Sequence, residues 1–326
     1  MDGILNLAGH NLISPVILSF VLGLAAAFFR SDLSFPEAIA KGMSLYLLFA
    51  IGFKGGAGVA AHGVDARLLS ALVVGVVLSL SLPLLAFALL RSMTKASVTD
   101  AAAVAAHYGS ISIVTFVAAS SLLAGQGIAA EGYMVAVAAA MEAPAIATAL
   151  WLVAWRGGGG ERMNAELVRE IMLNGSIVLL VGSFFIGWIT GDDGLEQIES
   201  FIVSPFKGVL CLFLLDMGLV AGRGLRSGHA ALSGGAILFG VVMPPLGACA
   251  GLLAALLLGL SLGGTVLLMV LAASASYIAV PAAMRVALPE ANPTLSLSLS
   301  LGITFPFNLI VGIPLYLAVA GVFVAP

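Results

Sequence analysis

Residues 68–90 read LLSALVVGVVLSLSLPLLAFALL, a run without a single charged side chain. About 20 predominantly apolar residues allow an α-helix to cross the hydrocarbon core of a bilayer, so this stretch predicts a membrane-spanning helix. Comparable runs follow one another along the 326 residues, separated by short polar breaks. They predict about ten helices, at 12–29, 36–54, 68–90, 100–124, 132–155, 168–190, 200–221, 234–259, 264–288 and 293–324.

The composition agrees with this interpretation. Hydrophobic residues make up 61% of the chain and charged residues 9%, whereas soluble domains carry roughly 25% charged residues. The net charge of −3, with the charges confined to connections, gives no support to nucleic-acid binding. Motifs of zinc hydrolases, serine hydrolases and phosphate-binding loops are absent from the sequence. We therefore predict an all-α integral membrane protein that is not an enzyme and holds no cofactor.

Basic residues near helix ends predict the orientation of the chain, because cytoplasmic connections are enriched in Lys and Arg. With the N-terminus outside, the outer connections hold Lys54 and Arg67. Ten crossings return the C-terminus to the outside as well. The inner connections then hold Arg30, Arg91, Lys95, Arg156, Arg162, Arg169, Arg223, Arg226 and Arg285.

An internal repeat divides the chain into two halves. Ser19-Phe20 with Gly23 recurs 164 residues later, and a pattern that starts at Lys41-Gly42 recurs 166 residues later. The predicted organisation is a five-helix repeat over 1–155, a Gly-rich cytoplasmic linker over 156–166 and a second repeat over 167–326. Five helices per half make the second half inverted, an arrangement found in many secondary transporters. The matching residues are Ser183, Phe184, Gly187, Lys207, Gly208, Leu214, Gly218 and Gly222, which correspond to Ser19, Phe20, Gly23, Lys41, Gly42, Leu48, Gly52 and Gly56.

Polar residues interrupt the fourth and ninth predicted helices. The fourth contains HYGSIS at 107–112, and the ninth contains AASASY at 272–277. An offset of 166 pairs Ser110 with Ser276, and the same offset pairs Glu142 with Asn308. Inverted-repeat transporters bind substrate where such helices are broken, so these stretches predict two facing breaks. Packing of Ser and Gly within membrane helices is the alternative interpretation of the serines.

The chemistry of such breaks suits a small anion. Helix N-termini present free N–H groups and a positive dipole end, and serine hydroxyls add further donors. The predicted substrate-binding residues are Gly109, Ser110, Ile111, Ser112, Ala275, Ser276 and Tyr277. Hard cations prefer oxygen ligands, and the predicted sodium-binding residues are Glu142, Ser274, Thr304 and Asn308. His107 is either a hydrogen-bonded helix residue or a proton sensor.

These stretches resemble the sodium-dependent bicarbonate permease family (SbtA-like). The resemblance runs over nearly the whole chain. It implies two inverted five-helix repeats, a core subdomain that moves against a gate subdomain in an elevator-type mechanism, and a homotrimer. It also implies that the substrate lies at the facing breaks. The residues that carry it lie in 35–39, 51–56, 109–110, 142–145, 272–274 and 281–293.

Three departures from the family pattern concern the ligand. Tyr277 stands where an acidic residue is usual, Glu142 where an Asp is usual, and the first break is less rich in small polar side chains. The linker between the halves is short, so docking of a PII-like regulator is not expected.

Together with these residues, the resemblance predicts a transporter in the inner (plasma) membrane of a bacterium that imports bicarbonate, or another small anion, together with sodium. Sodium is the co-transported ion, and membrane lipid is the surrounding partner. Two alternatives keep the fold: a sodium-coupled transporter of another small carboxylate, and a sodium/proton exchanger that uses Glu142 and His107. A non-transporting membrane receptor or scaffold is the alternative of a different class.

Overall fold

The computed structural model describes residues 14–63, 66–142, 144–155, 173, 175–227, 232–277 and 279–324. The predicted linker at 156–166 and both chain termini lie outside these residues, so their predicted positions stay predictions. All regular elements of the described residues are helices.

The first half of the chain contains α2 (Pro15–Phe28), α3 (Glu37–His62), α4 (Ala66–Met93), α5 (Val98–Gly109), α6 (Ile113–Gly125), α7 (Met134–Ala140) and α8 (Pro144–Trp155). The second half contains α10 (Gly175–Ile202), α11 (Phe206–Ser227), α12 (Gly234–Leu258), α13 (Leu262–Ala273) and α14 (Ala279–Ala287). The chain then continues through α15 (Pro293–Leu297), a π-helical stretch η1 (Ser298–Thr304), α16 (Phe305–Phe307), a second π-helical stretch η2 (Asn308–Gly312) and α17 (Ile313–Phe323).

Within the described residues, eight spans are long and apolar enough to cross a membrane, and α2 and α13 are shorter apolar helices. Eight of the ten predicted membrane helices thus have the required length and composition, and the shorter α2 and α13 lie where the first and the ninth were predicted. Apolar side chains such as Leu257, Ile189 and Val322 are largely exposed on the outer surface, as expected where lipid replaces water. With only helices as regular elements of its described residues, the chain is a multi-pass membrane protein.

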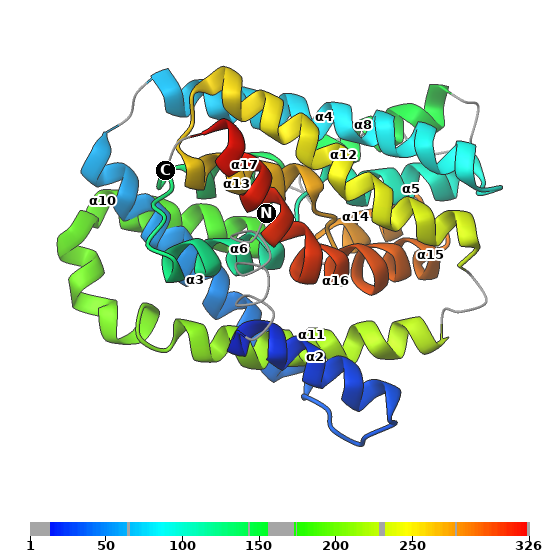
Figure 1. Cartoon of the computed structure of the whole chain (residues 1–326), viewed down its shortest axis with the longest axis horizontal. Coiled ribbons are helices and arrows are strands. Elements are labelled where there is room, and N and C mark those ends of the chain that lie inside the picture. Colours follow the sequence, from blue (N-terminus) through cyan, green and yellow to red (C-terminus); the bar gives the residue numbers. More distant parts are fainter. Residues whose placement is uncertain are drawn as a thin grey trace.

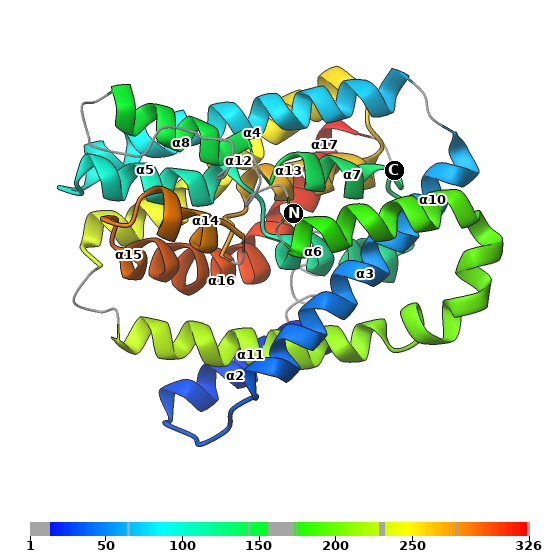
Figure 2. The ribbon, with the colours of Figure 1, turned by 180° about the vertical axis from the view of Figure 1, so that it is seen from behind.

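The helices form two groups. Helices α2, α3, α10 and α11, called here the four-helix layer, pack in two pairs, α2 with α11 and α3 with α10. The remaining helices form the main bundle, in which α12 packs against α13 and α4 against α5. Figures 1 and 2 show α2 and α11 along one side of the molecule, apart from α4, α5, α8 and α12 on the opposite side.

Glycines of the repeat make the contacts within the four-helix layer. A Cβ on Gly23 would lie 2.0 Å from the carbonyl oxygen of Leu215 in α11, and one on Gly187 would lie 2.1 Å from that of Phe53 in α3. Real Cβ atoms do not approach this closely, so both helix pairs require the absence of a side chain. These two glycines are the pair that recurs at an offset of 164, so equivalent residues of the two halves make equivalent contacts.

The predicted connection between residues 190 and 200 was wrong. Helix α10 continues to Ile202 beyond a kink at Gly191, whose φ of 59° is readily adopted by glycine. The acidic residues after the kink therefore lie on a helical stretch. Its partly buried apolar residues Leu195 and Ile198 precede the buried Ile202, and this spacing places them on one face. Tyr46 of α3 donates a hydrogen bond to the carbonyl of Phe201 (2.6 Å) and holds this end in place.

The segment with α5 and α6 is the most enclosed part of the molecule. The apolar window within residues 98–125 is completely buried by protein, whereas 22% of the corresponding window in 178–202 is buried. Irregular backbone at membrane depth is tolerated where protein surrounds it. The fold therefore provides a lipid-free environment at the point where a helix break was predicted.

Candidate functional site

Two helices of the main bundle are interrupted where the sequence predicts. Helix α5 ends at Gly109 and α6 starts at Ile113, while α13 ends at Ala273 and α14 starts at Ala279. The residues after the first helix of each pair, Ser110 and Ser274, have nearly the same extended conformation, with φ/ψ of −83°/165° and −86°/165°. The predicted breaks in the fourth and ninth helices are confirmed.

Serine capping explains how α6 starts again after the break. The Ser112 hydroxyl oxygen accepts hydrogen bonds from the Thr115 amide (3.2 Å) and the Thr115 hydroxyl (2.9 Å). The carbonyl of Ser112 accepts from the amide of Phe116. The amides of Ile113 and Val114 find no acceptor among the described residues, and the first N–H groups of a helix point out of its end. The N-terminus of α6 therefore presents two donors to the break.

The two breaks are bonded to each other. The Ser276 amide donates to the His107 carbonyl (2.7 Å), and the His107 Nδ1–H donates to the Ser276 carbonyl (2.5 Å). The Ser112 amide donates to the Ser274 hydroxyl oxygen (2.9 Å). Predicted substrate-binding residues from both halves are thereby brought together. His107 is a hydrogen-bonded helix residue, as one of the two interpretations held, and its predicted role in proton sensing stays a prediction.

The structural register between the breaks differs from the predicted one by two residues. Helices α5 and α13 both contain 12 residues, and an offset of 164 superimposes their ends. The capping serines before them, Ser97 and Ser261, keep the same offset, and each accepts a bond from the amide three residues later. Ser110 therefore corresponds to Ser274 and not to Ser276. The offset of 166 came from a match between the sequences of α3 and α11, but the contacts of these two helices superimpose at 162. Gly56 approaches the Phe184 carbonyl as Gly218 approaches that of Phe20.

Buried polar atoms without a partner mark the region of the breaks. Ser110 Oγ and Glu142 Oε2 are enclosed and form no hydrogen bond with the described residues. The Tyr277 hydroxyl is enclosed too; it lies beside the Ser112 hydroxyl without a well-formed bond. Unpaired buried polar groups are costly, and they are common where a ligand supplies the missing partner. Ile111 and Ala275, with 1% and 2% exposure, add buried apolar wall.

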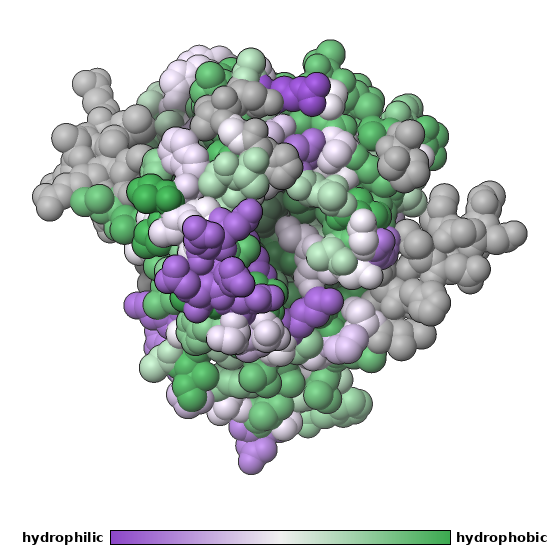
Figure 3. Space-filling model, turned by 90° about the vertical axis from the view of Figure 1, so that its left-hand side faces the viewer, coloured by the Kyte–Doolittle hydropathy of each residue, from purple (hydrophilic) through white to green (hydrophobic). Residues whose placement is uncertain are grey.

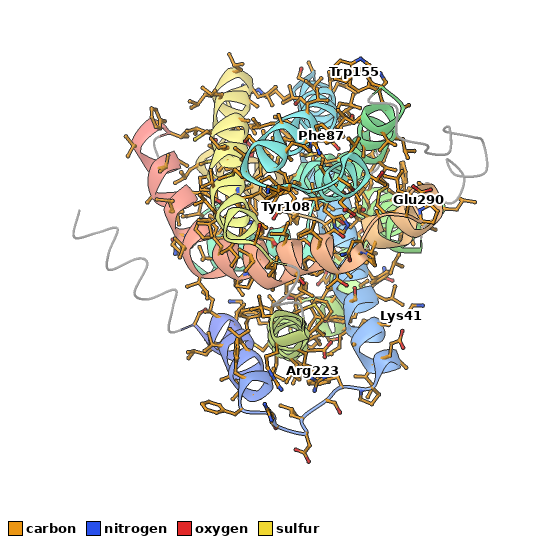
Figure 4. All side chains as sticks on the ribbon, turned by 90° about the vertical axis from the view of Figure 1, so that its right-hand side faces the viewer. Lys41, Phe87, Tyr108, Trp155, Arg223 and Glu290 are labelled. Carbon is orange, nitrogen blue, oxygen red and sulfur yellow. The ribbon has the colours of Figure 1, made fainter. Side chains whose placement is uncertain are left out.

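An aromatic contact connects the second break to the four-helix layer. The Tyr277 ring lies 5.3 Å from that of Phe305 in α16, which lies 5.3 Å from that of Phe20 in α2. Tyr108, next to the first break, lies in the interior of the molecule (Figure 4) and forms a hydrogen bond with Thr304 (2.6 Å). The tenth helical segment therefore contacts both breaks and the four-helix layer.

Three of the four predicted sodium ligands form hydrogen bonds within the main bundle. Asn308 donates to the Ala273 carbonyl (2.8 Å), Thr304 to the Gly240 carbonyl (2.7 Å) and Ser274 to the Leu271 carbonyl (2.9 Å). Each of their oxygens keeps a lone pair for a cation, because a hydroxyl or amide oxygen can accept twice. Glu142 is the fourth and is 7% exposed. The predicted ligand set stays a prediction.

Sequence reasoning missed the irregularity of the fifth and tenth segments. The fifth was predicted as one helix over 132–155, but α7 ends at Ala140 and α8 starts at Pro144, so Glu142 lies at an interruption. The tenth contains η1 and η2, which precede Pro306 and Pro314 by a few residues. Proline has no amide hydrogen and clashes with the carbonyl four residues earlier. Pro144, Pro306 and Pro314 were the signal that could have located the irregular segments. π-Helical turns are frequent at functional sites.

A family model described as the Na+-dependent bicarbonate transporter superfamily matches residues 15–321, nearly the whole chain. The chain belongs to this superfamily. No curated protein matches the chain.

Membership in the Na+-dependent bicarbonate transporter superfamily confirms the resemblance found in the sequence. It is a family of transporters and not of enzymes, and its name fits sodium and bicarbonate as transported ions. The multi-pass helical structure agrees with a membrane transporter.

Two cavities lie between the four-helix layer and the main bundle. A cavity of about 610 Å³ lies between α3 and α11 of the four-helix layer and α6 and α7 of the main bundle. A second cavity of about 340 Å³ lies beside it, and both are lined by Ser121 and Lys207. Figure 3 shows a hollow next to hydrophilic surface at the end of the molecule where α10 turns back.

Proposed function

We propose that the protein is a secondary transporter that imports bicarbonate, or a closely similar small anion, together with sodium. The observation that carries the proposal is the pair of bonded helix breaks in a chain of the Na+-dependent bicarbonate transporter superfamily. At these breaks the side-chain oxygens of Ser110 and Tyr277 are enclosed and form no well-formed hydrogen bond with the described residues. The Ser110 hydroxyl and the free amides of α6 are donors for an anion.

The anion site combines donors without a cationic side chain. The N-terminus of α6 contributes a positive dipole end, and backbone amides bind carboxylate-like groups well at such positions. Bicarbonate has three oxygens and one proton, so it can accept from the Ile113 and Val114 amides and donate to a hydroxyl. We assign Gly109, Ser110, Ile111, Ser112, Ala275, Ser276 and Tyr277 to this site.

Sodium binds next to the anion in this proposal. Glu142 supplies a negative charge at an interruption of the membrane helix, where an ionisable residue by default marks function. Ser274, Thr304 and Asn308 supply neutral oxygens. A bound sodium offsets the Glu142 charge and adds a positive charge beside the anion, so each ion favours binding of the other.

Transport proceeds by an elevator-type movement of the main bundle against the four-helix layer, which acts as the gate. Two observations support this division. Helix pairs α2/α11 and α3/α10 are interlocked by glycines, and the breaks are bonded to each other within the main bundle. The equivalent glycine contacts of the two halves also favour the inverted repeat. We further propose a homotrimer in a bacterial inner membrane with both termini outside.

The decisive experiment is uptake of labelled bicarbonate into proteoliposomes under an inward sodium gradient at fixed pH. We expect saturable uptake that is lost when potassium replaces sodium and is reduced in Ser110→Ala. Purified protein that elutes as a single species yet shows no saturable, sodium-dependent uptake contradicts the proposal. A parallel series with other small carboxylates ranks the anions.

A sodium/proton exchanger is the second candidate, because the unpartnered Glu142 Oε2 can bind either cation. It predicts that added sodium drives proton movement without bicarbonate. A pH-sensitive dye inside bicarbonate-free proteoliposomes separates the two functions: a sodium-induced pH change supports exchange, and its absence supports symport.

A further inference from the structure

Lys54 occupies an unusual position in the membrane-spanning helix α3. It lies eight residues before the end of that helix at His62, about 12 Å along its axis. Its ammonium group lies 4.4 Å from the centre of the Phe206 ring, and among the described residues no carboxylate pairs with it. Charged side chains inside membrane segments are costly and mark ion pathways more often than packing.

The surroundings of Lys54 form a chamber with excess positive charge. Lys54 and Lys207 both line the 610 Å³ cavity, together with the hydroxyls of Ser120 and Ser121. Glu131 lines it too, but both of its oxygens accept bonds from Ser261, at 2.7 Å and 2.9 Å. Two positively charged side chains thus line the cavity, and the one carboxylate in its wall is hydrogen-bonded to Ser261.

The chamber extends towards the helix breaks. Phe116 and Leu267 belong to its wall, and Phe116 follows Ser112 by one helical turn, about 6 Å along the axis of α6. Lys54 and Lys207 lie on the four-helix layer, whereas Phe116 lies on the main bundle. An anion in the chamber is therefore close to the proposed site but held by the other helix group.

We infer that Lys54 and Lys207 form an anion-attracting antechamber, which concentrates the small anion before it reaches the site between the breaks. This inference rests on the proposed function for the identity of the anion. A cluster of like charges in a low-dielectric cleft raises the local concentration of counter-ions and the rate of their association. The ammonium keeps this ability while it faces Phe206, because a ring face attracts a cation without neutralising its charge.

A measurement of local potential tests the antechamber without transport. Cys211 and Cys249 are replaced by Ala, and Ser121→Cys introduces a thiol in the wall shared by both cavities. The thiol is then modified with an anionic and with a cationic methanethiosulfonate reagent in proteoliposomes. In Lys54→Gln we expect the anionic-to-cationic rate ratio to fall about fivefold or more at low salt, and the difference to shrink at high salt.

Two matched variants sharpen the result. Lys54→Arg keeps the charge and should retain the ratio. Lys41→Gln removes a lysine from the other end of the same helix, away from the cavity wall, and should leave the ratio unchanged. A ratio unaffected by Lys54→Gln, or lowered equally by Lys41→Gln, overturns the inference. If Lys54→Gln does not fold, Lys207→Gln at an exposed position gives the same test.

Uptake kinetics separate this inference from the proposed function. We expect Lys54→Gln to raise the KM for bicarbonate several-fold with a maximal rate within about twofold of the parent protein. If the modification ratio at position 121 depends on Lys54 but the protein does not transport bicarbonate, the result supports an antechamber for another anion. Saturable bicarbonate uptake with a potential independent of Lys54 supports the proposed function and overturns the antechamber.

Discussion

His107 and Ser276 are bonded to each other twice, although 169 residues separate them: the Ser276 amide donates to the His107 carbonyl, and the His107 ring donates to the Ser276 carbonyl. One bond involves backbone alone, so its donor and acceptor do not depend on the side chain at position 107. The other depends on the imidazole. The two breaks are therefore held together by one bond that the backbone supplies and one that the side chain supplies.

His107→Ala should destabilise the protein and slow transport. Ser276 is 2% exposed. In the variant its carbonyl loses the hydrogen bond from the imidazole, which costs about 1–3 kcal/mol. We expect a melting temperature several degrees lower in detergent and a maximal uptake rate reduced about tenfold. His107→Asn, which keeps an N–H donor at a similar distance from the backbone, should recover part of both. Equal loss in the two variants argues against the role of the hydrogen bond.

Glu142→Gln should weaken sodium dependence specifically. Loss of a charged oxygen ligand lowers the affinity for a hard cation, and we expect the sodium concentration for half-maximal uptake to rise about tenfold, equivalent to about 1.4 kcal/mol. Uptake at a series of sodium concentrations measures it. Asp216→Asn is the control, because Asp216 is also buried but lies on α11, which packs mainly against α2. An unchanged sodium requirement in Glu142→Gln removes Glu142 from the ion site.

Gly187→Ala should disrupt the packing of α10 against α3. The added Cβ would lie 2.1 Å from the Phe53 carbonyl oxygen, so the helices must separate. We expect destabilisation of about 1–3 kcal/mol. Gly182→Ala in the same helix meets nothing within 4 Å and should be neutral or slightly stabilising, because alanine is the better helix former. Thermal unfolding of both variants in one detergent compares them, and similar melting temperatures contradict the proposed interlock.

Much of the fold could be predicted because hydropathy marks each helix. The breaks at Ser110 and near Ser276 were also predictable, since polar residues rarely cluster inside an apolar helix without reason. The register of the two halves was not predictable to the residue. The sequence match between α3 and α11 at an offset of 166 lies one helical turn from their contacts, which superimpose at 162, while α5 and α13 keep 164. The acidic side chains after Gly191 suggested a connection, but the apolar face of Leu195, Ile198 and Ile202 outweighed them.

The irregular tenth segment shows a different limit. Pro306 and Pro314 indicate that regular hydrogen bonding fails there, but they do not specify whether the helix breaks or widens into π-helical turns. The outcome depends on neighbours such as Gly240, whose carbonyl accepts from Thr304, and no local pattern encodes them. The partners of the predicted sodium ligands were out of reach for the same reason.

Removal of Asp100 and of Glu131 should have matching effects. Asp100 accepts from the Asn292 amide (2.7 Å) and the Ser97 hydroxyl (2.8 Å), and Glu131 accepts from the amide and hydroxyl of Ser261. Each carboxylate thus connects the start of α5 or α13 to the opposite half of the chain. We expect Asp100→Ala and Glu131→Ala each to lower stability by about 1 kcal/mol, measured by thermal unfolding. Glu290→Ala, at an exposed position, serves as the control, and a strong effect of one substitution alone contradicts the equivalence.

The shared length of α5 and α13 has a consequence for membrane voltage. Twelve residues span about 18 Å, little more than half of a hydrocarbon core of about 30 Å, and the two helices approach the breaks from opposite ends of the molecule (Figure 1). In the proposed transporter, an ion at the breaks would therefore have crossed roughly half of the electric field, whichever compartment it came from. At 100 mV, a full crossing costs or yields about 2.3 kcal/mol per elementary charge. Binding of a sodium ion alone would change in energy by about half of this amount. Binding of a sodium ion together with a bicarbonate ion would depend little on the voltage, because their charges cancel.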